Sequence, residues 1–265
     1  MSRQESPEVS APDELQVAEN IFRGVVVDPH SLAPEPALFA AQLRHAMRGW
    51  RAAAYRLVWL ELPIRRSVLI PVAVEAGFVF HHAEPGYVMM TCALDPYAPI
   101  PFYATHFIGA GGLVLNEAHE LLVIVEKAHR HNRPNYYKLP GGALRPREHV
   151  ADAAIREVRE ETGIETRFEA LTGFRHWHGY RFGKSDIYFI CRLKPLSHEI
   201  TIQESEIAAG MWMPLDRYLA DPNVGLFNKR MVEAAATGTG LVSGWFEGYE
   251  VTPETHEIFI PGDST

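Results

Sequence analysis

Three glutamates in one short segment have the spacing of a metal-binding face. Glu157, Glu160 and Glu161 lie at positions i, i+3 and i+4, which places their carboxylates on one side of a helix. Like charges held this close repel each other, so the bare cluster destabilises the helix that carries it. Clustered carboxylate oxygens are the ligands that a hard divalent cation such as Mg²⁺ prefers. We therefore interpret the three glutamates as a candidate cation site.

The residues around the glutamates predict the helix that must position them. Residues 138–142 read KLPGG, which is typical of a strand end followed by a tight turn. Gly163 stands where a left-handed residue usually ends a helix. Between these points, small and apolar residues recur at helical spacing and are expected to face the core: Ala151, Ala154, Ile155 and Val158.

A solvated helix face is the structural alternative, in which Arg156 and Arg159 neutralise the glutamates without a metal. Such a face does not require the five-residue gap between Gly142 and Glu148. Nor does it require Arg156 and Gly163 at their fixed offsets. The segment resembles the Nudix box, G-x5-E-x7-R-E-U-x-E-E-x-G-U with U aliphatic, and it matches every fixed position.

The resemblance implies an α/β fold, the Nudix α/β/α sandwich around a mixed sheet. It also implies hydrolysis of a nucleoside diphosphate linked to another moiety, with Mg²⁺ or Mn²⁺ as cofactor. Glu148 and Arg156 would join loop and helix through a salt bridge, and Gly142 and Gly163 complete the structural positions of the box. The implied metal ligands are three carboxylates and one glycine carbonyl: Glu157, Glu160, Glu161, and Gly141 or Gly142.

Shorter segments resemble one Nudix subfamily, which includes plant ADP-ribose/NADH diphosphatases and a human protein encoded antisense to basic fibroblast growth factor. Its members carry an N-terminal pre-Nudix domain with an acetyltransferase-like half-fold. The acyl-CoA loop of acetyltransferases is absent here, so we expect a structural or dimerising role for that domain. The matching segments are Gly77-Phe78, residues 81–84, Thr105-His106 with Gly109, and residues 182–186. The expected organisation is a disordered tail at 1–20, a small α/β pre-Nudix domain at 21–100, a Nudix domain at 105–240 and a C-terminal tail at 241–265.

Local patterns predict the elements of both domains. Residues 116–119 are expected to join two strands, 107–115 and 120–126, as a hairpin. Pro71 predicts a break or a late start in the helix at 65–76. Further helices are expected at 37–54 and 227–236, and further strands at 55–62, 77–82, 87–92, 167–174, 185–193 and 212–215.

Hydrolysis by water requires a base that accepts a proton, and two positions remain open for it. One is Glu160 or Glu161 within the box. The other is Glu206, six residues before Trp212, on a loop that carries a catalytic or metal-binding glutamate in several Nudix enzymes. Glu204 is its neighbouring alternative, and an exposed loop acid is the structural one. We assign Glu160 and Glu161 as ligands, and Glu206 as a base or additional ligand.

The candidate substrate contacts lie in RHWHGYRFGKSD, residues 175–186. Arg175 and Lys184 carry the donors that bind phosphate or ribose oxygens, and the subfamily shows an arginine and a histidine at the offsets of Arg175 and His178. Trp177 or Tyr180 offers a ring on which a base can stack. Ordinary strand-edge polarity is the structural alternative for all of these side chains.

Composition limits the class of protein and its partners. The 265 residues are 47% hydrophobic, which supports a packed core, and the net charge of −8 disfavours nucleic acid and anionic membrane as partners. Two cysteines, without a signal peptide or membrane span, predict buried thiols and a cytoplasmic location. The expected partner is a small nucleotide, and dimers are common among relatives. Two other functions remain open: a non-catalytic nucleotide-binding module, and a house-cleaning hydrolase of nucleoside triphosphates, coenzyme A or capped RNA.

Overall fold

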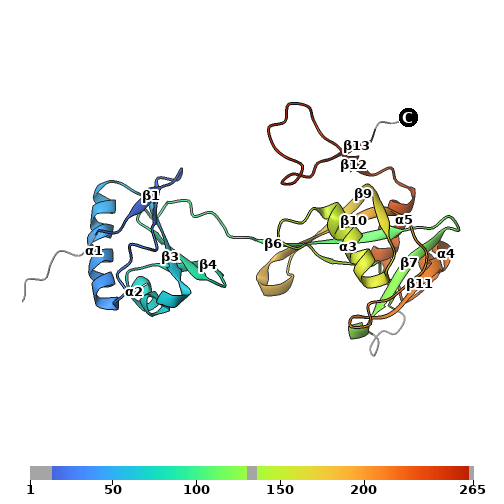
Figure 1. Cartoon of the computed structure of the whole chain (residues 1–265), viewed down its shortest axis with the longest axis horizontal. Helices are drawn as coiled ribbons and strands as arrows, with labels where there is room; N and C mark the ends of the chain where they lie inside the picture. The colour runs from blue at the N-terminus through green and yellow to red at the C-terminus, as the bar shows by residue number, and fades with distance from the viewer. Residues whose placement is uncertain (1–13, 130–135, 263–265) are drawn as a thin grey trace, which may run out of the picture. The chain divides into compact units, whose positions relative to one another are not determined.

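The chain divides into two compact units, Met1–Ala104 and Thr105–Thr265 (Figure 1). The computed structural model describes residues 14–129 and 136–262, so residues 1–13 of the expected tail lie outside the described part. Both units combine helices with mixed sheets, which confirms the predicted α/β class. No helix in the described ranges has the length and apolar character needed to cross a bilayer.

The first unit contains a mixed sheet whose described strands run in the order β1–β2–β3–β5–β4. Helix α1 (Pro36–Ala52) connects β2 to β3, which pair in parallel, and all other neighbours are antiparallel. The two strands predicted at 77–82 and 87–92 form β4 and β5, which pair as an antiparallel hairpin. The strands are β1 (Val17–Glu19), β2 (Gly24–Val27), β3 (Leu57–Pro63), β4 (Val79–Glu84) and β5 (Tyr87–Ala93).

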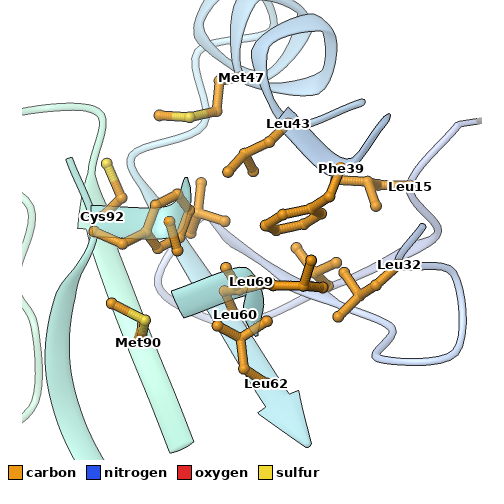
Figure 2. Close-up of a cluster of buried hydrophobic side chains, with 14 of the residues drawn as sticks. Leu15, Leu32, Phe39, Leu43, Met47, Leu60, Leu62, Leu69, Met90 and Cys92 are labelled. Atoms are coloured by element: carbon orange, nitrogen blue, oxygen red, sulfur yellow. The ribbon is translucent and has the colours of Figure 1, made fainter. Parts of the chain in front are cut away.

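The core of the first unit forms where α1 lies over this sheet (Figure 2). Phe39, Leu43 and Met47 recur every four residues on α1, so one stripe of the helix is buried against the strands. Pro71 has the effect predicted for it. A 3-10 helix, η1 (Ile64–Leu69), comes first, and helix α2 (Ile70–Glu75) starts with the proline in its first turn. The expected acetyltransferase-like character of this unit stays a prediction.

The second unit is built on a mixed sheet whose described strands run in the order β13–β12–β9–β10–β6–β8. Strands β6 and β10 are parallel, and the other neighbours are antiparallel. The strands are β6 (His106–Val114), β8 (Gly141–Ala143), β9 (Thr166–Trp177), β10 (Ser185–Pro195), β12 (Leu241–Ser243) and β13 (Phe259–Pro261).

Helices cover both faces of this sheet, as the α/β/α sandwich requires. Helix α3 (Val150–Thr162) packs with Ala110 and Cys191 on one face. Helix α5 (Leu226–Thr237) packs with Leu113 and Ile190 on the other, together with the short helix α4 (Leu215–Ala220). Two single-turn 3-10 helices, η2 (Lys127–His129) and η3 (Arg181–Gly183), lie in connections. The helix predicted at 227–236 is confirmed as α5, whereas α4 has no counterpart among the predictions.

The predicted pairing of residues 107–115 with 120–126 is wrong. Strand β7 (Glu120–Glu126) pairs with β11 (Ile207–Pro214) in a separate two-stranded sheet, while β6 pairs with β10 and β8. The turn itself forms, and it leaves one bridge between Leu115 and Leu121. Both strands contain a continuous buried run, residues 109–114 in β6 and 121–125 in β7, and such runs do not specify the partner strand as an alternating pattern does.

Both predicted tails contribute strands to the sheets, which corrects the expected organisation. Residues 17–19 form β1, which pairs with β2. Strands β12 and β13 pair with each other, and Leu241 of β12 pairs with Leu171 of β9. Three-residue strands are too short to show a recognisable alternation, so the sequence pattern does not reveal them.

A close contact at Gly112 lets α3 lie directly on β6. A Cβ atom at this position would lie 2.5 Å from a methyl carbon of Val158 and 2.8 Å from one of Leu193. Both neighbours are fully buried, so neither has free space into which it can move. The absence of a side chain at residue 112 therefore sets how near the acidic helix approaches the sheet.

We predict that Gly112→Ala lowers the free energy of unfolding of the second unit by about 1–3 kcal/mol, because the added methyl overpacks the helix–sheet contact. The matched control is Gly49→Ala in α1, where no heavy atom lies within 4 Å of the added methyl. That change should raise stability by about 0.5–1 kcal/mol. Calorimetric melting of both variants measures the two changes in stability. A change of the same sign in both variants would contradict the packing argument.

Candidate active site

Helix α3, which carries the three glutamates, ends at a glycine cap and against a loop. Gly163 adopts the predicted left-handed conformation, with φ of 72°, and its N–H donates to the carbonyl of Arg159 at 2.8 Å. In the loop at 201–203, the N–H of Thr201 donates to the backbone carbonyl of Thr162 at 2.9 Å. The N–H of Gln203 donates to the backbone carbonyl of Glu161 at 3.2 Å. These bonds fix the end of the helix from which Glu160 and Glu161 extend.

The guanidinium of Arg156 joins three carboxylates. It donates to Glu148 at 2.5 and 2.9 Å, to Glu157 at 2.7 Å and to Glu160 at 3.0 Å. Arg145 adds a backbone bond to Glu148 and a side-chain bond to Glu160, each of 2.8 Å. The predicted salt bridge between Glu148 and Arg156 is therefore present, and the arginine also holds two of the three glutamates.

Glu161 is the buried member of the cluster, with 5% of its surface exposed. Burial raises the pKa of its carboxyl to about 7, although Lys138 and the N–H of Gly141, which donates to it at 2.8 Å, act in the opposite direction. The nearby charges of Glu157 and Glu126 raise this pKa further. A carboxyl in this position favours a cation beside it, because a cation would stabilise the ionised form.

The carboxylate of Glu157 lies directly against the turn before α3. A Cβ atom on Gly142 would lie 2.7–2.9 Å from the carboxylate atoms of Glu157, so only glycine leaves room for it. Across the described ranges, no three His, Cys, Asp or Glu side chains converge in the geometry of a metal site. Glu160 is turned toward the two arginines and is 41% exposed. The donors that fit a divalent cation are therefore the carboxylates of Glu157 and Glu161 beside the glycine backbone.

A cavity of about 190 Å³ opens beside Gly141 on the face of the sheet covered by α5. Gly141 links the cavity to the glutamate cluster, because it lines the cavity and donates its N–H to the carboxylate of Glu161. The lining combines aromatic rings with a few polar groups, as nucleotide and other small-molecule sites do. Its members are Tyr136, Lys138, Leu139, Gly141, Arg175, Tyr188, Ile190, Tyr218, Phe227, Asn228, Met231 and Val232.

Two buried polar atoms in this lining have no hydrogen-bond partner among the described residues: Nε of Arg175 and the hydroxyl of Tyr218. Arg175 donates from its Nη2 to the buried Asp186 at 2.6 Å. Its guanidinium carbon lies 5.8 Å from the ring centre of Tyr188 and 5.7 Å from that of Phe227. The ring of Trp177, on the same strand, lies at 5.5 Å, so a carboxylate and three rings surround the guanidinium while its buried Nε stays unpaired.

Comparison with known proteins places this geometry in a family. A family profile described as the NUDIX domain matches residues 105–235, and one described as the Nudix hydrolase domain matches residues 15–94. Nudix hydrolase 2 of Arabidopsis thaliana is 38% identical over 218 residues, which are 81% of this chain and 77% of that protein. The chain belongs to the Nudix hydrolase family.

Other relatives differ in how much of their own length the chain covers. Nudix hydrolase 8 of Arabidopsis thaliana is 42% identical over 79% of this chain, which spans 58% of that protein. Human nucleoside diphosphate-linked moiety X motif 6 is 35% identical over 82% of this chain and 67% of its own length. Among solved structures, the MutT protein of Methanosarcina mazei Go1 aligns with 51% of this chain and 96% of its own, with a TM-score of 0.43 and 20% identity.

The remaining residues predicted for this Nudix site lie apart from the cavity. His178 bonds the hydroxyl of Ser185 at 2.9 Å, and Lys184 is in the turn between β9 and β10; neither lines the cavity. Glu206 is exposed in the loop before β11, where its carbonyl accepts a bond from the N–H of Lys127 at 2.8 Å. The proposed roles of His178, Lys184 and Glu206 stay predictions.

Sequence reasoning did not identify several residues that the fold brings beside the Nudix box. Lys138 forms an ion pair with Glu126, and both charges act on Glu161. The available signal was a charged residue, Glu126, at the end of the apolar run LLVIV. Tyr188 and Tyr218 line the cavity but have ordinary core positions in the sequence, so no local pattern marks them.

We predict that Glu148→Gln lowers the free energy of unfolding at pH 7 by about 1–3 kcal/mol, because Arg156 loses its bidentate partner. Arg156 holds the pKa of the Glu148 carboxyl below its usual range, so ionisation of Glu148 stabilises the folded state. This contribution is present above the unfolded-state pKa of about 4.3 and is lost as pH falls through the lower, folded-state pKa.

The difference in the free energy of unfolding between wild type and Glu148→Gln should therefore become smaller as the pH falls. Urea unfolding at several pH values from 7 to 3 measures this difference. Glu233→Gln, which removes an exposed ion pair to Arg230, is the control and should change stability by less than about 0.5 kcal/mol. A gap that stays constant with pH would show that the charge of Glu148 is not the cause.

Proposed function

We propose that the chain hydrolyses the diphosphate linkage of a nucleoside diphosphate joined to another moiety, in a reaction that depends on Mg²⁺ or Mn²⁺. ADP-ribose and NADH are the substrates proposed first, with AMP as one product. The observation that carries the proposal is the meeting of Glu157 and Glu161 at Gly141–Gly142, directly beside the cavity that contains Arg175. The name of the human relative, nucleoside diphosphate-linked moiety X motif 6, supports the same class of substrate.

The proposed division of work follows from the contacts in the box. A divalent cation bound there would neutralise diphosphate oxygens and lower the pKa of an attacking water. Glu157 and Glu161 would hold the cation, and the N–H of Gly141 orients the Glu161 carboxylate. Arg156 positions Glu157 and Glu160. Glu160 reaches the same face of α3, and we propose it as a further ligand once it turns from Arg145.

The cavity would bind the nucleoside side of the substrate. Tyr188 and Phe227 supply ring surface, and the unpaired Nε of Arg175 supplies a donor for an oxygen of ribose or phosphate. Arg175 is fixed by Asp186, so little conformational freedom is lost when it binds an acceptor. His178 and Lys184 lie outside the cavity lining, and we propose that they contact the part of the substrate that extends beyond it.

The base that deprotonates water has the same two candidates as before. Glu206 belongs to the loop whose N–H groups bond to the end of α3, so its segment adjoins the box. Glu160 or Glu161 is the candidate within the box. A kcat that falls strongly in Glu206→Gln, with metal affinity unchanged, would assign the base to Glu206.

A substrate screen tests the function itself. Full-length protein is incubated with ADP-ribose, NADH, nucleotide sugars, coenzyme A, nucleoside triphosphates and capped RNA, each with Mg²⁺, with Mn²⁺ and with chelator. Metal-dependent release of AMP from ADP-ribose or NADH supports the proposal. Metal-dependent cleavage of only the last three substrates would assign a house-cleaning role. Tight nucleotide binding without any product would instead indicate a regulatory module.

We predict that Glu161→Gln lowers kcat by at least about 100-fold, because the buried carboxylate nearest Gly141 loses its charge. The fold should persist, since a glutamine oxygen can still accept the bond from Gly141. Glu165→Gln, which removes an exposed pair with Arg159, is the control and should keep wild-type turnover. Initial rates and melting temperatures measure both variants, and full activity in Glu161→Gln would make the metal assignment wrong.

We predict that Arg175→Lys lowers kcat/KM about 10-fold, mainly through KM, because the substitution keeps the charge but removes the Nε donor and the planar fork. Arg167→Lys on the same strand, where the side chain is 54% exposed and bonds the carboxylate of Glu169 at 3.4 Å, is the matched control. Steady-state kinetics with the best substrate of the screen measure KM and kcat for both variants. Equal KM values for the two variants would exclude Arg175 from substrate binding.

A further inference from the structure

The C-terminal segment binds the start of α3. The carboxylate of Glu257 accepts hydrogen bonds from the N–H of Val150 at 2.8 Å and from that of Ala151 at 3.0 Å. These residues are separated from Glu257 by more than 100 positions in the chain. A carboxylate therefore reaches across the fold to the first turn of the helix that carries the box.

The first turn of α3 lacks a cap of its own. The N-cap residue, His149, makes no side-chain bond to the helix, so the first N–H groups have no local side-chain partner. Glu257 accepts from two of them, as a good N-cap side chain does from one. Its negative charge also lies at the positive end of the helix dipole, where an anion is stabilising. Glu257 thus performs the role of an N-cap from another part of the chain.

Further contacts hold this segment, residues 253–261, which we call the C-terminal clamp. The Nε2–H of His149 donates to the carbonyl of Pro253 at 2.7 Å. At the other end of the clamp, β13 pairs with β12, and the ring of Phe259 lies 5.5 Å from that of Phe168. The clamp therefore joins the sheet that α3 covers to the beginning of α3.

We propose that Glu257 is a positioning residue for the metal site, which it serves by fixing the first turn of α3. The inference rests on the proposed function only in that the acidic face of α3 holds the cation. Glu257 touches neither substrate nor cation in this proposal. It acts through the backbone of the helix, and the C-terminal clamp is then a working part of the hydrolase unit.

The connection from the first turn to the acidic face runs through Glu148. This residue lies two positions before Val150, and its carboxylate holds the guanidinium of Arg156. Arg156 in turn bonds Glu157 and Glu160. If the first turn frays, the loop that carries Glu148 loses its anchor, and the arginine no longer holds these carboxylates in one arrangement.

Amide hydrogen exchange measures how strongly Glu257 stabilises the first turn of α3, and it does so independently of enzymatic activity. In Glu257→Ala, the amides of Val150 and Ala151 should exchange about 2- to 30-fold faster, the range that corresponds to loss of an N-cap. Glu257→Gln keeps one acceptor oxygen and should give a smaller increase. Glu250→Ala, at an exposed position before the clamp, is the matched control and should leave these rates unchanged.

The effect of the first turn on the metal site is measured by titration with Mn²⁺, in which electron paramagnetic resonance reports the concentration of the free ion. Mn²⁺ affinity should fall by a factor in the same range in Glu257→Ala and stay at the wild-type value in Glu250→Ala. The double variant Glu257→Ala/His149→Ser supplies a local cap in place of the distant one and should recover both amide protection and Mn²⁺ affinity. Recovery by a local cap would not occur if Glu257 only held the C-terminal segment in place.

Unchanged exchange at Val150 and Ala151 in Glu257→Ala would overturn the proposal, and so would faster exchange with unchanged Mn²⁺ affinity. Failure of the local cap to restore affinity would do the same. These outcomes are distinct from failure of the proposed function. A chain that binds Mn²⁺ through α3 but releases no AMP would refute the hydrolase assignment and leave the role of Glu257 intact.

Discussion

The bidentate pair between Arg156 and Glu148 is the interaction on which the acidic site depends. Three carboxylates on one helical face repel each other, and one of them is buried where water cannot screen it. Arg156 offsets part of this repulsion because its planar fork reaches Glu148, Glu157 and Glu160 at once. A lysine at this position would supply the charge but not the geometry. The arginine therefore holds Glu157 and Glu160 in place, and its hydrogen bonds do not include the buried Glu161.

The rest of the second unit restrains the helix that carries this face. The left-handed Gly163 and the loop at 201–203 hold its end, and the bare backbone of Gly112 sets its distance from the sheet. The C-terminal clamp holds its beginning through Glu257. A site of this kind needs its ligands held within a fraction of an ångström, which rigid support on several sides provides. The cavity lies on the opposite face of the same sheet from α3, and two of its lining residues, Lys138 and Gly141, act on the carboxyl of Glu161.

Much of this arrangement could be predicted from the sequence, because the box is continuous and each position has a local role. The spacing of Glu157, Glu160 and Glu161, the stop at Gly163 and the late start of the helix at Pro71 all follow from rules about neighbouring residues. What depended on distant pairing could not be predicted. The cavity takes its lining from β9, β10, α4 and α5, and the cap on α3 comes from Glu257, which no local pattern marks. The wrong hairpin has the same origin, because two buried apolar runs do not identify their partners.

The central claim is that Glu157 and Glu161 hold a divalent cation against the turn at Gly141–Gly142. A crystal structure of the full chain grown with Mn²⁺, with anomalous differences recorded at the manganese edge, tests this claim most directly. The account predicts an anomalous peak in direct coordination with both carboxylates and a glycine carbonyl of the turn, with Arg156 still bonded to Glu148. Manganese bound elsewhere on the chain, with Glu157 still paired to Arg156 and Glu161 still bonded only to Gly141, would contradict it.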